Sequence, residues 1–184
     1  MAGTEYTLPR PAFDEKVKLM IVVAPFYRDI ADMLLAGARA EIEAAGGIHE
    51  TVEVPGALEV PTAIAMADRM RRHDGFVALG CVIRGETTHY ETVCADSSRG
   101  LMLLGLEGTL IGNGILTVEN RDQAIARADP ARMNKGAGAA AAALHLVALA
   151  RQWGGRRTEV GFLPGPGDIP PGDDGTTPRA RART

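Results

Sequence analysis

Aromatic side chains and cysteines are scarce in this sequence, and both shortages narrow the class of protein it encodes. Phe, Tyr and Trp make up 4% of the 184 residues, so the core has to be built from closely packed Ala, Val, Leu and Ile. Two cysteines cannot form the disulfide framework on which small secreted domains depend. With 46% hydrophobic and 23% charged residues, the composition excludes a disordered, collagenous or coiled-coil chain.

The chain also lacks an apolar run of membrane length and an excess of positive charge. Its longest Ala- and Leu-rich stretch, residues 137–150, spans 14 residues and contains His145, whereas a membrane helix needs about 20. A formal net charge of −3 argues against a nucleic-acid-binding domain. No signal-peptide pattern opens the chain. We therefore expect a cytoplasmic protein that binds neither membrane nor nucleic acid.

Glycine and proline become frequent after Trp153 and mark a boundary in the chain. Residues 154–184 contain 12 Gly or Pro among 31 residues and end in PRARART. Such a segment buries too little apolar surface to offset its ordering entropy. We expect an N-terminal arm at 1–17, one domain at 18–153 and a disordered tail at 154–184. The terminal Arg cluster is either solvated or a contact for an anionic partner.

Apolar runs alternate with helical patterns between residues 18 and 153. The patterns predict strands at 18–26, 49–54, 75–83 and 109–118, and helices at 29–45, 61–72, 88–107, 120–128 and 134–153. This alternation is typical of right-handed βαβ crossovers, so we expect a four-stranded parallel sheet with helices on both faces. Ligands in such α/β folds bind beyond the carboxyl ends of the strands.

The loop at residues 84–89 (RGETTH) carries the richest binding signal. Thr88 and Glu91 predict a capping box for the helix that follows, whose free N–H groups and partial positive charge suit a phosphate. A tight turn with a helix cap is the alternative. The overlapping segment 80–87 (GCVIRGET) resembles a P-loop, but Glu86 stands where the phosphate-binding Lys belongs. That carboxylate excludes a P-loop NTPase.

Several side chains near the predicted strand ends and helix starts could carry chemistry. His89, in the first turn of a helix, is either a proton-transfer group or a surface histidine. Glu59 follows a Pro-Gly turn and either accepts ligand hydroxyls or favours the helix dipole. Phe26 is either a ring platform or, as the default, a core residue. Arg127 and Lys135 flank a helix break and could clamp a phosphorylated substrate. No spacing of His, Cys, Asp and Glu suggests a metal site.

Five segments, in order, resemble the 6,7-dimethyl-8-ribityllumazine synthase family. They are APFY (24–27), VPGALEVP (54–61), GCVIRGETTHYETV (80–93), NGILTVENRDQAIARA (113–128) and NKG (134–136), and each lies at a predicted strand end or helix start. The resemblance covers about residues 18–153. It implies a flavodoxin-like three-layer α/β sandwich, homopentamers that sometimes pack into icosahedral shells, active sites between neighbouring subunits, and no cofactor.

The resemblance further implies a reaction and a role for each matching position. The reaction joins 5-amino-6-(D-ribitylamino)uracil to 3,4-dihydroxy-2-butanone 4-phosphate and yields the lumazine, phosphate and water. The implied roles are proton transfer for His89; pyrimidine or ribityl contacts for Phe26, Ala57, Leu58, Glu59, Val82, Ile83, Asn113 and Lys135; and phosphate contacts for Glu86, Thr87 and Arg127. Arg127 and Lys135 would come from the neighbouring subunit. Asn113 stands where many members carry an aromatic residue, which changes how the ring would pack.

Two other classes of function remain as alternatives. The first is a non-catalytic flavin or lumazine carrier on the same fold, and the second is a shell-forming structural protein. His89, Arg127 and Lys135 together favour an enzyme, because a carrier needs no proton-transfer group beside a second, phosphate-sized site. The Ala-rich helix at 134–153 is either a packing face between subunits or an ordinary buried helix.

Overall fold

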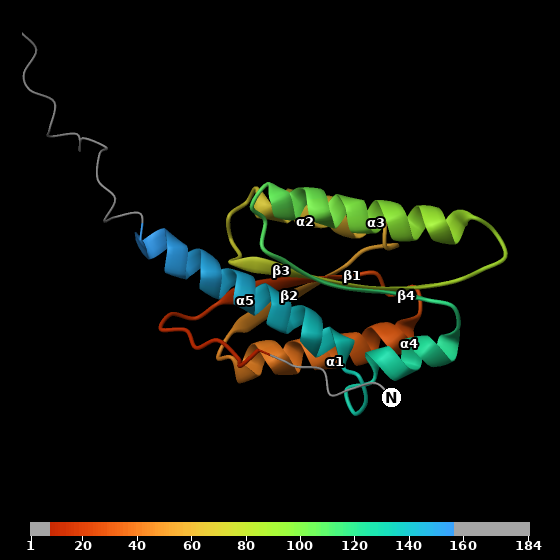
Figure 1. Ribbon diagram of the computed structural model, residues 1–184, viewed down its shortest axis with the longest axis horizontal. Helices are drawn as coiled ribbons and strands as arrows, with labels where there is room; N and C mark the ends of the chain where they lie inside the picture. Colours follow the sequence, from red (N-terminus) through yellow and green to blue (C-terminus); the bar gives the residue numbers. More distant parts are fainter. Residues whose placement is uncertain (1–7, 157–184) are drawn as a thin grey trace, which may run out of the picture.

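Four parallel strands form the centre of the computed structural model, which describes residues 8–156 (Figure 1). They are β1 (Lys18–Val23), β2 (Ile48–Glu53), β3 (Gly75–Ile83) and β4 (Ile111–Val118), in the order β2-β1-β3-β4. Strand β3 is almost wholly buried because helices cover both faces of the sheet, which explains its continuous apolar run. The predicted parallel sheet is confirmed.

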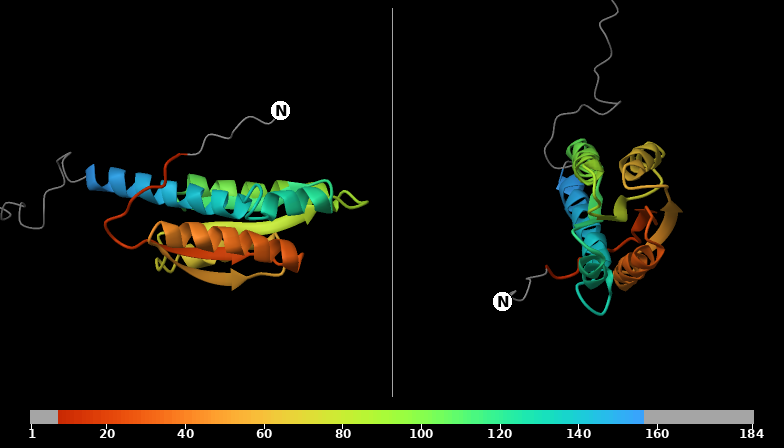
Figure 2. Two further views of the ribbon diagram at one scale, coloured as in Figure 1. Left: turned by 90° about the horizontal axis from the view of Figure 1, so that it is seen from below. Right: turned by 90° about the vertical axis from the view of Figure 1, so that its right-hand side faces the viewer.

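Five described helices cover the sheet in two layers. Helices α1 (Arg28–Ala44), α4 (Arg121–Ala128) and α5 (Lys135–Arg156) pack on one face, and α2 (Glu59–Asp68) and α3 (His89–Leu106) on the other (Figures 1 and 2). Each layer encloses its own cluster of buried aliphatic side chains. This three-layer arrangement is flavodoxin-like, as the sequence predicts.

The elements begin and end close to their predicted bounds, with local differences. Strand β1 ends at Val23 rather than at Phe26, so Phe26 lies in a loop. Helix α2 ends at Asp68 rather than at residue 72, and Arg71 lies in the left-handed region with φ 51°. Gly46, with φ 73°, follows α1 as the expected helix-ending glycine.

The predicted capping box at the start of α3 is wrong. Thr88 is the N-cap residue, but its side chain accepts no capping hydrogen bond. The Glu91 carboxylate pairs instead with the guanidinium of Arg84. By contrast, Asn120 caps α4, and its side chain accepts a hydrogen bond of 3.0 Å from the backbone N–H of Gln123.

Glycines bring α5 unusually close to its neighbours. A Cβ at Gly112 in β4 would overlap the carbonyl oxygen of Ala139, and one at Gly136 in α5 would overlap that of Leu34. These contacts set where α5 begins, and therefore where Lys135 is held.

Residues 1–7 of the expected arm and 157–184 of the expected tail lie outside the described residues. The division of the chain at residues 18 and 153 therefore stays a prediction. Within residues 8–156, no helix combines the length and apolar character that a membrane crossing requires.

Candidate active site

A cleft of about 410 Å³ opens beside the carboxyl ends of β1 and β3. These two strands are adjacent in the sheet but not consecutive in the chain, so they mark its topological switch point. Loops that leave the sheet in opposite directions separate at such a point and leave a crevice. The volume suits a small-molecule ligand, since ligand pockets typically measure about 300–1,000 Å³.

The cleft brings together seven of the predicted site residues. Its walls come from the loops after β1, β2 and β3, and they include Phe26, Ala57, Leu58, Glu59, Val82, Ile83 and His89. Residues that the sequence analysis did not assign to the site also line it: Ala24, Tyr27, Pro55, Gly56, Cys81 and Val93. Val93 lies four residues after His89 on α3, so helical spacing alone could have identified it.

Phe26 is an exposed ring at the mouth of the cleft, not a core residue. Its exposed fraction is 74%, and its ring meets Tyr27 edge to face with centroids 5.0 Å apart. The default assignment of Phe26 to the core is therefore wrong. An unburied aromatic face beside a cleft can stack on a planar ligand.

Glu59 supplies a carboxylate on the second wall. It is the first residue of α2, and its N–H donates a hydrogen bond of 3.2 Å to the carbonyl of Gly56. A Cβ at Gly56 would lie 2.9 Å from the Glu59 Oε2 atom, so the carboxylate lies over this glycine. The two interpretations of Glu59 are compatible, because a first-turn acid can also accept hydroxyl hydrogen bonds from a ligand, and its role in binding stays a prediction.

His89 is the first residue of α3, and its exposed imidazole lines the third wall. Among residues 8–156, no side chain hydrogen-bonds to this imidazole or forms an ion pair with it. A solvent-accessible imidazole inside a ligand-sized cleft can exchange protons with a bound molecule.

Arg84 lies at the end of β3, immediately before the exposed loop that leads to His89. Its Nε donates a hydrogen bond of 2.6 Å to Glu119, and its Nη1 pairs with Glu91. Hydrogen bonding to Glu91 and then to Glu119 raises the pKa of the Arg84 guanidinium, and Arg84 in turn lowers the pKa of the Glu91 carboxyl. Tyr90 lies beneath the guanidinium, with its ring centroid 4.1 Å from the central carbon. Burial is the main reason that the pKa of Tyr90 is raised.

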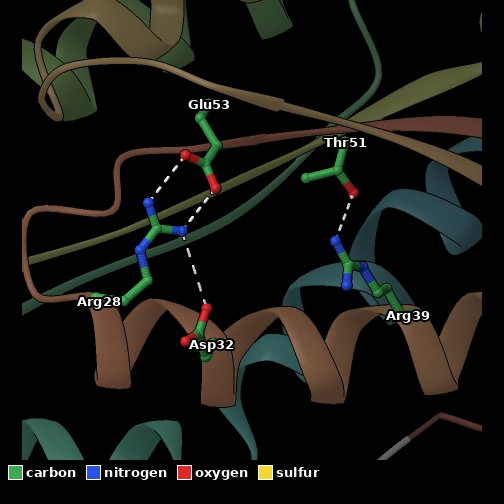
Figure 3. A network of polar contacts seen from close by, with 5 residues as sticks. All are labelled: Arg28, Asp32, Arg39, Thr51 and Glu53. Carbon is green, nitrogen blue, oxygen red and sulfur yellow. Dashed lines mark hydrogen bonds and ion pairs between the residues drawn. The ribbon is translucent and has the colours of Figure 1, made fainter.

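A second ion pair joins the start of α1, after the loop with Phe26, to the end of β2, before the loop with Glu59 (Figure 3). The Arg28 guanidinium donates hydrogen bonds of 2.6 and 2.9 Å to the two carboxylate oxygens of Glu53, and Asp32 lies 4.0 Å away. The bidentate bond to Arg28 lowers the pKa of the Glu53 carboxyl. Because Arg28 follows Phe26 closely and Glu53 precedes Pro55, this pair ties the two loops together.

Cys81 lies in the cleft wall as an unreactive thiol. It is buried, and burial raises its pKa to about 11, so the thiol stays protonated near neutral pH. The other cysteine, Cys94 on α3, is partly buried. Among the described residues, no three His, Cys, Asp or Glu side chains gather into a group that could hold a metal ion.

The remaining predicted site residues do not line this cleft. Glu86 and Thr87 lie in the exposed loop between β3 and α3. Asn113 pairs with Ala78 in the sheet register, three residues before Cys81, and a rise of about 3.3 Å per residue places it about 10 Å along the strand from this lining residue of the cleft. Arg127 donates a hydrogen bond of 3.3 Å to the carbonyl of Gln123.

Lys135 lines a different cavity of about 530 Å³, which is built mainly from the start of α5, the N-terminal segment and α1. Arg10 and His145 line the same cavity, and Arg10 forms an ion pair of 2.8 Å with Glu41. Within one chain, the residues of the predicted site are therefore divided between this cleft and side chains that lie elsewhere.

The strand order, the two helical layers and a cleft at the switch point define a flavodoxin-like α/β protein with a small-molecule site. The chain also matches the family model described as 6,7-dimethyl-8-ribityllumazine synthase over residues 16–151. That match spans well over half of the chain, so the chain belongs to the 6,7-dimethyl-8-ribityllumazine synthase family.

Individual relatives agree with this assignment. The chain is 57% identical to a 6,7-dimethyl-8-ribityllumazine synthase of Jannaschia sp. (strain CCS1) over 165 residues, which cover 89% of this chain and 93% of the relative. It is 55% identical to the protein of the same name from Novosphingobium aromaticivorans over 136 residues, or 74% and 98% of the two chains. The protein of that name from Sphingopyxis alaskensis is 58% identical over 136 residues, or 74% and 96%.

Proposed function

We propose that this chain is a transferase that condenses 5-amino-6-(D-ribitylamino)uracil with 3,4-dihydroxy-2-butanone 4-phosphate to form 6,7-dimethyl-8-ribityllumazine, phosphate and water. The observation that carries the proposal is the single cleft in which an exposed aromatic ring, a carboxylate and an accessible imidazole converge: Phe26, Glu59 and His89. A planar pyrimidine with a polyhydroxyl chain needs the first two groups, and the condensation needs the third.

The proposed binding mode follows the walls of the cleft. Phe26 stacks on the pyrimidine ring, and Val82 and Ile83 form the apolar surface against its other side. The ribityl chain runs along Ala57 and Leu58, where Glu59 accepts hydrogen bonds from its hydroxyls. This orientation directs the substrate's amine toward the wall formed by His89.

The phosphorylated ketone binds next to the first turn of α3 in this proposal. Glu86 and Thr87 offer backbone N–H groups and a hydroxyl there, close to the positive end of the helix dipole. The amine adds to the ketone and loses water to give an imine. Loss of the C3 proton and of phosphate from C4 then leaves an enol, which tautomerises to a carbonyl at C3, and the ribityl-bearing nitrogen closes the ring on that carbon with loss of a second water. Each step moves a proton, which is the role of His89, and holding the two substrates together lowers the barrier further.

We also propose that the active site is completed by a neighbouring copy of the chain within a homopentamer. Asn113, Arg127 and Lys135 do not line the cleft of their own chain, which supports a contribution from these side chains to the cleft of a neighbouring copy. Large apolar side chains exposed on α2 and α3 support such an assembly: Met66, Met102, Leu103 and Leu106.

Substitution of His89 tests the proposed chemistry. We expect His89→Ala to lower kcat by about 10²–10⁴-fold while the affinity for the pyrimidine substrate stays nearly unchanged, because Phe26 and Glu59 are intact. The measurement is the absorbance of the lumazine formed from both substrates by purified protein.

His49→Ala is the matched control, because His49 is the second residue of β2, at the end away from the cleft. Loss of pyrimidine affinity or of folding in His89→Ala would assign His89 a structural role. Absence of turnover in an assembled, folded wild type would favour the carrier instead.

A further inference from the structure

The loop from β3 to α3 has neither the buried side chains nor the side-chain cap that commonly fix a loop before a helix. Residues 84–89 are all exposed, a Cβ at Gly85 would meet no atom within 4 Å among the described residues, and Thr88 makes no capping hydrogen bond. Helix α3 nevertheless has to present His89 at one position in the cleft. Some other interaction must therefore fix the first turn of the helix.

Arg84 provides that interaction by bridging three elements. Arg84 directly follows the last residue of β3, and its guanidinium pairs with Glu91 in the first turn of α3. It also donates a hydrogen bond of 2.6 Å to Glu119, just beyond β4. Its guanidinium also covers the ring of Tyr90, the residue that follows His89. The planar guanidinium fork fixes direction as well as distance, so the bridge orients the helix turn relative to the sheet.

The charges in this cluster indicate that Arg84 does not act as a free phosphate ligand. One guanidinium faces two carboxylates, so the local sum is one negative charge beside the loop. Without Arg84, both Glu91 and Glu119 would be uncompensated close to the place where the phosphorylated ketone is proposed to bind.

We propose that Arg84 is a positioning residue for catalysis, which acts through Glu91, Glu119 and Tyr90 to hold His89 and the phosphate-binding loop in place. This inference rests on the proposed role of His89. Exposed ion pairs add little to folding stability, whereas a misplaced catalytic group lowers the rate strongly. The effect of removing Arg84 should therefore appear in kcat and hardly at all in thermal stability.

The test compares Arg84→Met with Arg99→Met as a matched control. Arg99 lies on the same helix and pairs with Asp96 on that helix, at a distance of 3.8 Å. We expect Arg84→Met to lower kcat by about 10–100-fold, with an almost unchanged KM for the pyrimidine substrate and a melting temperature close to that of Arg99→Met. The KM for the phosphorylated ketone should rise, because two carboxylates lose their partner.

A double variant separates positioning from charge. Arg84→Met with Glu91→Gln has the same local charge sum as the wild type but no bridge. We expect the KM for the phosphorylated ketone to return close to the wild-type value while kcat stays low. Recovery of kcat in this variant would assign the whole effect to charge and overturn the proposal.

Arg84→Lys keeps the test informative if the Met variant fails to fold. Lysine retains the charge, but its single ammonium lacks the fork that spans both carboxylates, so we expect kcat between those of the wild type and Arg84→Met. Wild-type kcat in Arg84→Lys, or equal kcat in the Arg84→Met and Arg99→Met variants, would overturn the inference. If the wild type itself shows no turnover, the proposed function fails, and the two failures are thereby distinguished.

Discussion

At the scale of single residues, exposure distinguishes the phenylalanine at the cleft from a phenylalanine packed in the core. The exposed fraction is 74% for Phe26 and 1% for Phe76 in the core. A ring exposed to this extent contributes little to the free energy of unfolding, so its role as a binding platform can be tested separately from the stability of the fold.

Phe26→Ala should weaken substrate binding and leave the fold intact. Loss of base stacking costs about 1–3 kcal/mol, so we expect the KM for the pyrimidine substrate to rise about 5–150-fold. The free energy of unfolding should change by less than about 0.5 kcal/mol, as for other surface substitutions. Steady-state kinetics and urea denaturation measure the two quantities.

Phe76→Ala is the contrasting control for this prediction. Its ring is buried on the α2–α3 side of the sheet, and truncation of a buried Phe costs about 3–5 kcal/mol of stability. A large stability loss in Phe26→Ala with an unchanged KM would contradict the role of Phe26 as a binding platform.

At the scale of elements, the position of α5 depends on glycines at two close contacts. Gly136 faces the backbone of Leu34 in α1, whereas Gly138, two residues further along the same helix, has nothing within 4 Å of its added Cβ among the described residues. A side chain at position 136 would therefore overlap α1, whereas position 138 on the same helix has room for one.

Gly136→Ala should destabilise the protein, and Gly138→Ala should not. An overlapping methyl group in a packed contact costs about 1–3 kcal/mol, while alanine at an open helical position gains up to about 1 kcal/mol over glycine. Urea denaturation of both variants measures this difference. Equal stabilities would show that α5 can move away from α1, and with it the start of the helix at Lys135.

At the scale of the whole molecule, the cleft beside β1 and β3 holds only part of the expected site. The register places Asn113 about 10 Å from Cys81 at a rise of about 3.3 Å per residue, and Lys135 lines a separate cavity. Methionine and leucine side chains are exposed on α2 and α3, on the same face of the sheet as the buried cluster around Phe76. Assembly and activity should therefore depend on each other.

Met102→Glu tests this dependence, because the exposed fraction of Met102 is 63% and the residue lies on α3. We expect the wild type to sediment at about five times the 19.4 kDa mass of one chain, or as a larger shell, as closed symmetric assemblies do. A buried charge should shift Met102→Glu to smaller species and lower turnover, whereas Met102→Leu keeps both. Analytical ultracentrifugation and the lumazine assay decide the outcome, and a fully active monomer would contradict the proposal of a shared site.

The elements and most of the cleft could be predicted from the sequence, because they depend on short-range patterns. The apolar run of β3 predicts its bounds at residues 75–83, and the chain places Phe26, Glu59 and His89 just beyond three strands. Parallel strands bring those positions to one edge whatever the details of packing.

The polar contacts around the cleft could not be predicted in the same way. Thr88 and Glu91 match the spacing of a capping box, yet the Glu91 carboxylate pairs with Arg84. The same guanidinium also binds Glu119, which directly follows β4 and lies 35 residues after Arg84 in the chain. Pairings such as Arg28 with Glu53 depend on which strands become neighbours, and local spacing contains no information about that.

Periodicity and turn residues act over a few positions, so the class of fold, the order of its elements and the residues at the strand ends follow from the amino-acid sequence. The exposure of Phe26, the pairing of Arg84 with two carboxylates, and the positions of Asn113 and Lys135 away from the cleft of their own chain follow from the three-dimensional packing. The reason is physical: exposure and ion pairing depend on which distant segments pack together, and packing is a property of the whole chain.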